Sequence, residues 1–104
     1  MQSITARALK EKMESGEALQ LIDVREPEEH AAFNIGGELI PLAEITRSAG
    51  RISNDKPVVI YCYHGIRSQL AIQRLQEKYG FTNLINLIGG TAMWEKEILT
   101  AGKG

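Results

Sequence analysis

Short apolar runs alternate with segments of helical periodicity along most of the chain. The runs over 19–24, 58–61 and 83–87 contain few polar positions, as expected for strands buried on both faces of a parallel sheet. Between these runs, apolar residues recur every three or four positions, as on the buried face of a helix. The pattern therefore predicts an α/β domain whose parallel sheet is covered by helices on both faces.

The remaining elements follow from shorter signals, such as capping residues, proline and glycine. In the first half of the chain we expect a short strand ending at Ile4, a helix from Ala6 to Ser15 capped by Thr5, a helix from Pro27 to about Ala32, a turn over 34–37 and a brief strand over 38–40. A short helix over 41–48 and a loop over 53–57 should follow. In the second half we expect a helix with Ala71, Ile72, Leu75 and Tyr79 on its buried stripe and Gly80 as its stop, and a closing helix from Thr91 with Met93, Trp94 and Ile98 available to pack. The final residues, 101–104, are expected to form a frayed tail.

Composition limits the function classes. The 104 residues suit one domain, 1–104, and the hydrophobic share of 43% with 24% charged residues is that of a soluble globular protein. The net charge of -1 gives no basic surface for nucleic acid. No apolar run approaches the ~20 residues that span a membrane, and the N-terminus lacks the apolar core of a signal peptide. We therefore expect a cytoplasmic protein with neither nucleic acid nor membrane as partner.

The chain has one cysteine and two histidines, so it can form no internal disulfide and no cysteine-rich zinc site. A reducing compartment fits this composition, and we expect no metal and no organic cofactor.

Cys62 ends the apolar run that begins at Val58, and a helical segment starts shortly after it. In parallel sheets, ligands collect at the carboxyl ends of the strands, and this strand is predicted to be central. A thiolate is favoured beside a helix N-terminus or an arginine. Gly65 lets the loop turn its amides inward, and Arg67 adds a guanidinium group suited to an oxyanion. The stretch therefore predicts a nucleophile combined with an anion cradle.

Each of these residues also has a purely structural interpretation. A lone cysteine is often a small buried hydrophobe, Arg67 could pair with a surface glutamate, and His64 could be a solvated loop side chain. For Cys62, its position between a strand and a helix, with Gly65 and Arg67 nearby, favours the functional interpretation.

Three segments, taken together, resemble the signature segments of the single-domain rhodanese family, in the family's order and spacing. They are Leu-Ile-Asp-Val-Arg-Glu-Pro-Glu-Glu-His over 21–30, Tyr-Cys-Tyr-His-Gly-Ile-Arg-Ser over 61–68, and Phe-Thr-Asn-Leu-Ile-Asn-Leu-Ile-Gly-Gly over 81–90 followed by Trp94. The resemblance covers nearly the whole chain. It implies a three-layer fold with a central parallel sheet of about five strands.

The resemblance also implies a sulfurtransferase. Cys62 would take the sulfane sulfur of thiosulfate or a related donor as a persulfide, and cyanide, a thiol or a sulfur-accepting protein would remove it in a ping-pong scheme. Arg67 would bind the sulfonate end of the donor, and Asp23 with Arg25 would order the loop as structural support. The substrate-binding amides would be those of Tyr63, His64, Gly65, Ile66, Arg67 and Ser68.

The chain departs from the family pattern at two places. Asn-Ile-Gly-Gly-Glu over 34–38 replaces the usual His-Ile-Pro-Gly-Ala, and the chain is about one residue shorter before Pro41. We expect this to alter the geometry of one edge of the pocket. Tyr63 and His64 make the loop bulkier and less cationic than versions with a second basic residue. Small dianions should therefore bind modestly. His30, Phe33 and Trp94 are interpreted as core or surface residues.

Two alternatives remain open. A cysteine phosphatase or arsenate reductase of the related fold also uses a strand-loop-helix anion cradle, but its loop is longer than the four residues between Cys62 and Arg67. A non-catalytic docking or regulatory domain could keep the fold, and the intact Cys62 argues against it.

Overall fold

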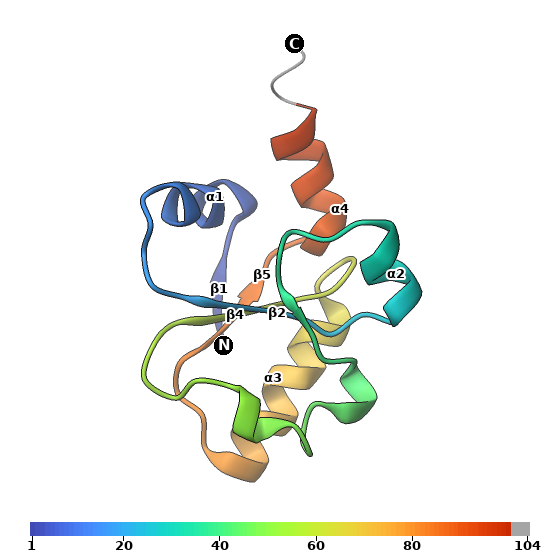
Figure 1. The fold of residues 1–104 in the computed structure, drawn as a ribbon. Coiled ribbons are helices and arrows are strands. Elements are labelled where there is room, and N and C mark those ends of the chain that lie inside the picture. Colours follow the sequence, from blue (N-terminus) through green and yellow to red (C-terminus); the bar gives the residue numbers. More distant parts are fainter. Residues whose placement is uncertain (101–104) are drawn as a thin grey trace.

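The computed structural model describes residues 1–100, so the tail expected over 101–104 lies outside the described residues. Five parallel strands form one sheet in the order β1-β5-β4-β2-β3 (Figure 1). The strands are β1 (Gln2–Ile4), β2 (Gln20–Asp23), β3 (Glu38–Leu39), β4 (Val58–Tyr61) and β5 (Leu84–Leu87). The helices are α1 (Ala6–Glu14), α2 (Pro27–Ala32), α3 (Ile66–Tyr79) and α4 (Gly90–Trp94), which continues as a π-helical segment, η3 (Glu95–Leu99). This is the predicted fold class, with β4 at the centre.

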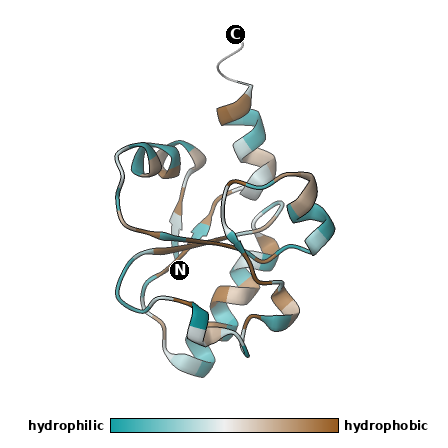
Figure 2. Ribbon diagram, in the orientation of Figure 1, coloured by the Kyte–Doolittle hydropathy of each residue, from teal (hydrophilic) through white to brown (hydrophobic). Residues whose placement is uncertain are grey.

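The sheet separates two apolar clusters, one on each face. On one face, α3 packs against the sheet through Ala71, Ile72 and Leu75. On the other, Leu9 of α1 and Trp94 of α4 cover Val59. The brown band along the strands in Figure 2 marks the apolar residues between the helices. The near-continuous apolar strands are therefore explained by burial on both faces.

The predicted helix starts rest on observed side-chain caps. Thr5 Oγ1 accepts a hydrogen bond from the Ala8 amide at 3.1 Å, as expected for an N-cap. At the start of α2, Glu26 and Glu29 form a reciprocal capping box around Pro27. These local signals fix where α1 and α2 enter the fold.

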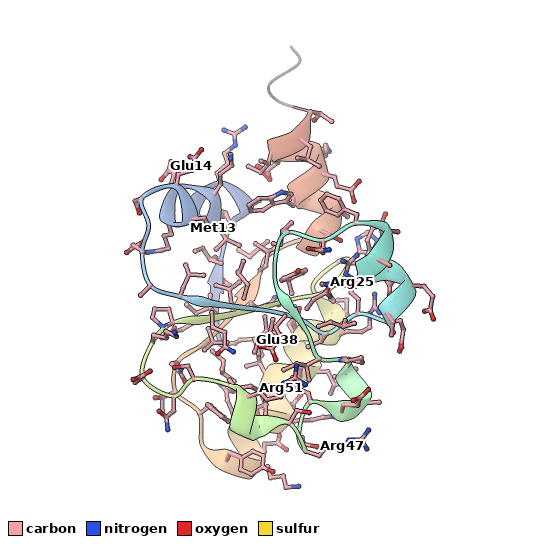
Figure 3. All side chains as sticks on the ribbon, viewed as in Figure 1. Met13, Glu14, Arg25, Glu38, Arg47 and Arg51 are labelled. Atoms are coloured by element: carbon pink, nitrogen blue, oxygen red, sulfur yellow. The ribbon has the colours of Figure 1, made fainter. Side chains whose placement is uncertain are left out.

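Two predictions about the helices are wrong in detail. The short helix expected over 41–48 is a 3-10 turn, η1 (Leu42–Glu44), and a second one, η2 (Ala49–Arg51), follows. An ion pair between Glu38 and Arg51 ties η2 to β3 (Figure 3). Tyr79 does not join the buried stripe of α3, because it is 49% exposed and its hydroxyl donates to the carbonyl oxygen of Thr46 at 2.9 Å. A tyrosine hydroxyl needs such a partner, which keeps this ring at the rim.

Over residues 1–100, none of the helices combines the length and the apolar character that crossing a membrane would require.

Candidate active site

Cys62 follows β4 directly and stands at the carboxyl end of the central strand. The residue is only 1% exposed, and its side chain belongs to the apolar cluster beneath α3. The start of α4 holds the adjoining loop from behind, since the Thr91 amide donates to the Cys62 carbonyl at 2.9 Å and the Ala92 amide donates to the Tyr63 carbonyl at 3.0 Å. The loop carbonyls are thereby turned away from the sulfur.

Gly90 makes this close approach of α4 to the loop feasible. Its φ of +57° lies in the left-handed region, and a Cβ there would run into the carbonyl oxygens of Cys62 and Tyr63. A residue without a Cβ at this position therefore makes room for the loop.

The Cys62 sulfur is surrounded by hydrogen-bond donors. The Gly65 amide donates to Sγ at 3.0 Å and the Ser68 amide donates to it at 3.4 Å. The Ser68 hydroxyl oxygen lies 3.5 Å from the same sulfur. Donors in this arrangement stabilise negative charge on sulfur, because backbone N–H groups at the start of a helix form an anion site.

Asn86 of β5 extends this network, and the sequence analysis missed it. The Ser68 hydroxyl donates to Asn86 Oδ1, and both residues are buried. The signal was available in the sequence, since Asn86 is a polar residue in an otherwise apolar strand, and buried polar groups need partners.

Arg67 is paired with Glu29 of α2. Its Nη1 donates to Oε1 at 2.7 Å and its Nη2 donates to Oε2 at 2.9 Å, a bidentate pair with both side chains about one-third exposed. The hydrogen bond to Arg67 is the main cause that lowers the pKa of Glu29 to about 2. The structural alternative for Arg67, a glutamate partner, is thus present.

Asp23 is the centre of a buried polar cluster beside the loop. Arg25 donates to its two carboxylate oxygens at 3.0 and 2.9 Å, and its guanidinium group also reaches the Phe33 carbonyl (Figure 3 shows Arg25 beside α2). His30 Nδ1 lies 2.9 Å from Asp23 Oδ2. Asp23 is paired with Tyr61 in the sheet register, so the cluster braces the strand that carries Cys62.

The altered turn over 34–37 packs against Tyr61. The Gly37 amide donates to the Tyr61 hydroxyl oxygen at 3.2 Å, and burial raises the pKa of that phenol to about 12. Asn34 closes the turn, because its Oδ1 accepts from the Gly36 amide at 2.8 Å. The departure from the family pattern is therefore an ordered turn that packs against the residue preceding Cys62.

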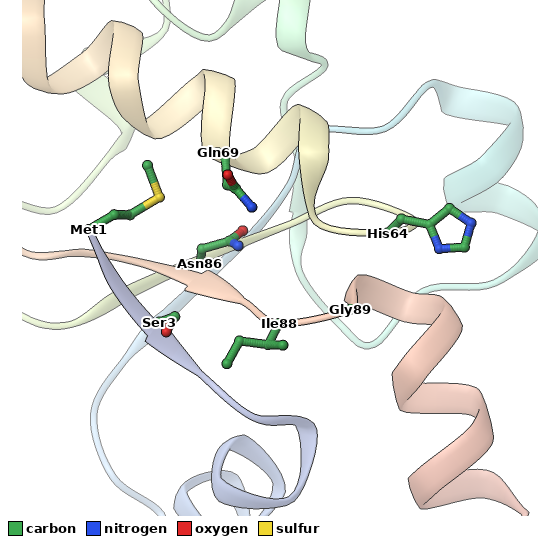
Figure 4. Close-up of a pocket in the computed structure, with 7 residues that line it drawn as sticks. All are labelled: Met1, Ser3, His64, Gln69, Asn86, Ile88 and Gly89. Atoms are coloured by element: carbon green, nitrogen blue, oxygen red, sulfur yellow. The ribbon is translucent and has the colours of Figure 1, made fainter.

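The remaining loop residues face outward. Tyr63 and His64 are exposed and their rings meet edge-on with centroids 4.3 Å apart, while Ile66 is 72% exposed. An open groove of about 420 Å³ starts at His64 and runs past Asn86 toward β1, lined by Met1, Ser3, His64, Gln69, Asn86, Ile88 and Gly89 (Figure 4). Within residues 1–100, no three acidic, histidine or cysteine side chains gather as metal ligands.

Comparisons with known proteins identify the family of this fold. The chain matches the rhodanese-like domain family over residues 5–97. A rhodanese-related protein of known structure from Thermoplasma volcanium superposes with a TM-score of 0.83 at 31% identity, covering 94% of each chain.

Two relatives carry names that bear on function. The chain is 36% identical to the thiosulfate sulfurtransferase GlpE of Coxiella burnetii, over 72% of this chain and 70% of the relative. It is 37% identical to YrkF of Bacillus subtilis, a candidate sulfur carrier protein, over 88% of this chain. The chain spans about half of that relative's length, 49%.

Proposed function

The chain belongs to the rhodanese-like domain family, and from this premise we propose that it is a sulfurtransferase that carries a sulfane sulfur on Cys62. The observation that supports this most directly is the pair of donors aimed at the Cys62 sulfur, the amides of Gly65 and Ser68, with the Ser68 hydroxyl oxygen 3.5 Å from the same atom. Such a cradle stabilises both a thiolate and a persulfide anion.

The first half-reaction loads the sulfur. The Cys62 thiolate attacks the outer sulfur of thiosulfate or a related donor, a bond forms between Sγ and that sulfur, and the old S–S bond breaks. Its electron pair leaves with sulfite, or with the thiolate of another donor. This is covalent catalysis by an activated cysteine, and it needs no separate oxidant or reductant.

The second half-reaction unloads the sulfur. Cyanide or a thiolate attacks the terminal sulfur of the persulfide, and the electron pair of the broken bond returns to Cys62. The acceptor is a small molecule or a thiol on another protein. Tyr63 and Ile66 of the same loop have exposed side chains, which such an acceptor would contact.

The supporting residues have distinct roles in this proposal. The cradle is formed by the loop segment Tyr63, His64, Gly65, Ile66, Arg67 and Ser68. The ion pair between Asp23 and Arg25 holds the end of β2 beside this loop. Arg67 shares its guanidinium group with Glu29, so a donor sulfonate would have to compete with that carboxylate.

Steady-state kinetics test the proposal. Thiocyanate formation from cyanide is measured with thiosulfate and, separately, with 2-hydroxyethyl hydropersulfide as donor. We expect parallel double-reciprocal lines as the two substrates are varied, and no turnover with Cys62→Ser, which changes a single atom. Absence of turnover with both donors would overturn the proposal, and activity retained in Cys62→Ser would show a different nucleophile.

A further inference from the structure

Glu29 occupies the face of Arg67 that would otherwise receive an anionic donor. Both Nη atoms of Arg67 are used in a fork-to-fork pair, at 2.7 and 2.9 Å. Such a bidentate arrangement is also the geometry in which a guanidinium group binds a sulfonate or phosphate. The carboxylate of Glu29 therefore stands where a sulfonate would make its strongest contacts.

Glu29 is held in this position by its own helix. As part of the α2 capping box, its Oε1 also accepts the Glu26 amide at 3.0 Å. Its pKa of about 2 keeps it ionised at any pH near neutrality. A carboxylate fixed by both the helix cap and Arg67 is costly to displace, because the incoming anion must replace both interactions.

The charges next to this pair do not favour a dianion either. Arg25 is engaged by Asp23 through two hydrogen bonds, and Glu26 adds a further carboxylate that acts on Arg67. Arg25 and Arg67 thus face the carboxylates of Asp23, Glu26 and Glu29. A dianion approaching Cys62 meets repulsion from these groups that a less charged donor largely avoids.

Three exposed apolar side chains lie on the loop or on the first turns of α3. Ile66, immediately before Arg67, is 72% exposed, and Tyr63 and Leu70 are 44% and 38% exposed. Ile66 and Leu70 are one helical turn apart on α3 and share its outer face. Such a surface suits an organic group attached to the donor sulfur.

We propose that Glu29, by occupying Arg67, makes the site select organic hydropersulfides, R–S–SH, over thiosulfate as sulfur donors. This inference rests on the proposed sulfurtransferase function and names its donor class. The Cys62 thiolate attacks the terminal sulfur, the bond between the two donor sulfurs breaks, and R–S⁻ leaves with the electron pair and takes up a proton. The products are a thiol and the Cys62 persulfide.

The test compares kcat/KM for thiosulfate and for 2-hydroxyethyl hydropersulfide, with cyanide as acceptor, in the wild type and in Glu29→Gln. Glutamine also suits this position of a capping box, so the cap of α2 should be retained, and circular dichroism checks the fold. We expect the wild type to favour the hydropersulfide. We expect Glu29→Gln to raise kcat/KM for thiosulfate about tenfold and to change the value for the hydropersulfide less than about threefold.

Two further variants locate the effect. Glu28→Gln removes the same charge from an exposed neighbour on α2 and should leave the donor ratio unchanged. Glu29→Gln combined with Arg67→Ala should lose the gain for thiosulfate, because the gain requires the released guanidinium group.

The inference is overturned if the wild type prefers thiosulfate, or if Glu29→Gln leaves the donor ratio unchanged. Either result still shows turnover, so it is distinct from failure of the proposed function, in which neither donor is used.

Discussion

At the scale of single residues, the Cys62 sulfur lies at the end of a short hydrogen-bonded series that leads into the sheet. Ser68 lies 3.5 Å from Sγ and donates to Asn86, and both Ser68 and Asn86 are buried. Because a hydroxyl group has a single proton, Asn86 influences how Ser68 is oriented toward the sulfur. We interpret Asn86 as a positioning residue that acts through Ser68.

This interpretation predicts that Asn86→Ala slows sulfur loading about fivefold, as expected for the loss of one hydrogen bond of about 1 kcal/mol. Ser68→Ala should slow it more, and the double variant should be no slower than Ser68→Ala alone, because the two residues act as a unit. The measurement is the single-turnover rate of persulfide formation.

Asn83→Ala is the matched control for Asn86→Ala. Asn83 precedes β5 and donates to the Ser53 and Lys56 carbonyls at 2.8 and 2.7 Å, where it ties two loops together. Its loss should lower the unfolding midpoint and leave the loading rate unchanged. If the Ser68 and Asn86 substitutions had additive effects on the rate of persulfide formation, Asn86 would not act through Ser68.

The sequence predicted that Cys62 lies in a loop between a strand and a helix, as the structure shows, but it did not indicate that Glu29 and Asn86 contact Arg67 and Ser68. Cys62, Gly65 and Arg67 are close in the chain, so their spacing carries the information. Glu29 and Asn86 reach the site from α2 and β5, and the contact between Glu29 and Arg67 joins residues 38 positions apart. Such contacts depend on how the helices and strands are arranged, which local patterns do not encode.

At the scale of elements, α2 and α3 are joined across the site by the Glu29–Arg67 pair. The folded-state pKa of Glu29, about 2, is below its ordinary value of 4.5. A lowered carboxyl pKa contributes stability that is present above pH 4.5 and is lost as the pH falls toward 2. The pair therefore supports the fold at neutral pH but weakens in acid.

We predict that the wild type is more stable than Glu29→Gln at neutral pH by on the order of 1 kcal/mol, a value reduced for solvent screening of a pair about one-third exposed. The difference should shrink between pH 4.5 and about 2. Urea unfolding of both proteins across this range measures it. A difference that stays constant down to the lowest pH would show that the pair does not carry the effect.

The turn between α2 and β3 is a second element-scale feature. A Cβ on Gly37 would lie 2.7 Å from Cε1 of the buried Tyr61 ring, closer than side chains can approach. We predict that Gly37→Ala costs about 1–3 kcal/mol, the range typical of overpacking, and lowers the urea midpoint accordingly.

Gly50→Ala is the matched control for Gly37→Ala. A Cβ on Gly50 meets no heavy atom within 4 Å, so its effect should stay within about 0.5 kcal/mol. Equal losses in the two variants would contradict the packing of this turn against Tyr61.

At the scale of the whole molecule, strand order explains why several elements contact the Cys62 loop. β4 is central, and its neighbours β2 and β5 bring Asp23 and Asn86 to either side of the Cys62 loop. The helices α3 and α4 both begin beside this loop, so α3 directs amides at the sulfur and α4 directs amides at the loop carbonyls. The site is therefore a product of the entire topology.

Much of this topology was predictable from the chain. Apolar runs fix the three long strands, and capping residues fix the starts of α1 and α2, because these signals are local. The short helix predicted over 41–48 is wrong, since this segment and the residues that follow it fold into 3-10 turns, and Ile45 and Ile52 join the core without helical periodicity. Tyr79 was misplaced because periodicity alone does not register the need of its hydroxyl for a partner.

The central claim is that Cys62 holds a transferred sulfur, and intact mass spectrometry tests it most directly. After incubation with 2-hydroxyethyl hydropersulfide, the wild type should gain the mass of one sulfur atom, peptide mapping should place it on Cys62, and cyanide should remove it. Cys62→Ser should gain nothing under the same conditions. A wild-type protein that stays unmodified with both this donor and thiosulfate, or that carries the added sulfur at another residue, would contradict the account.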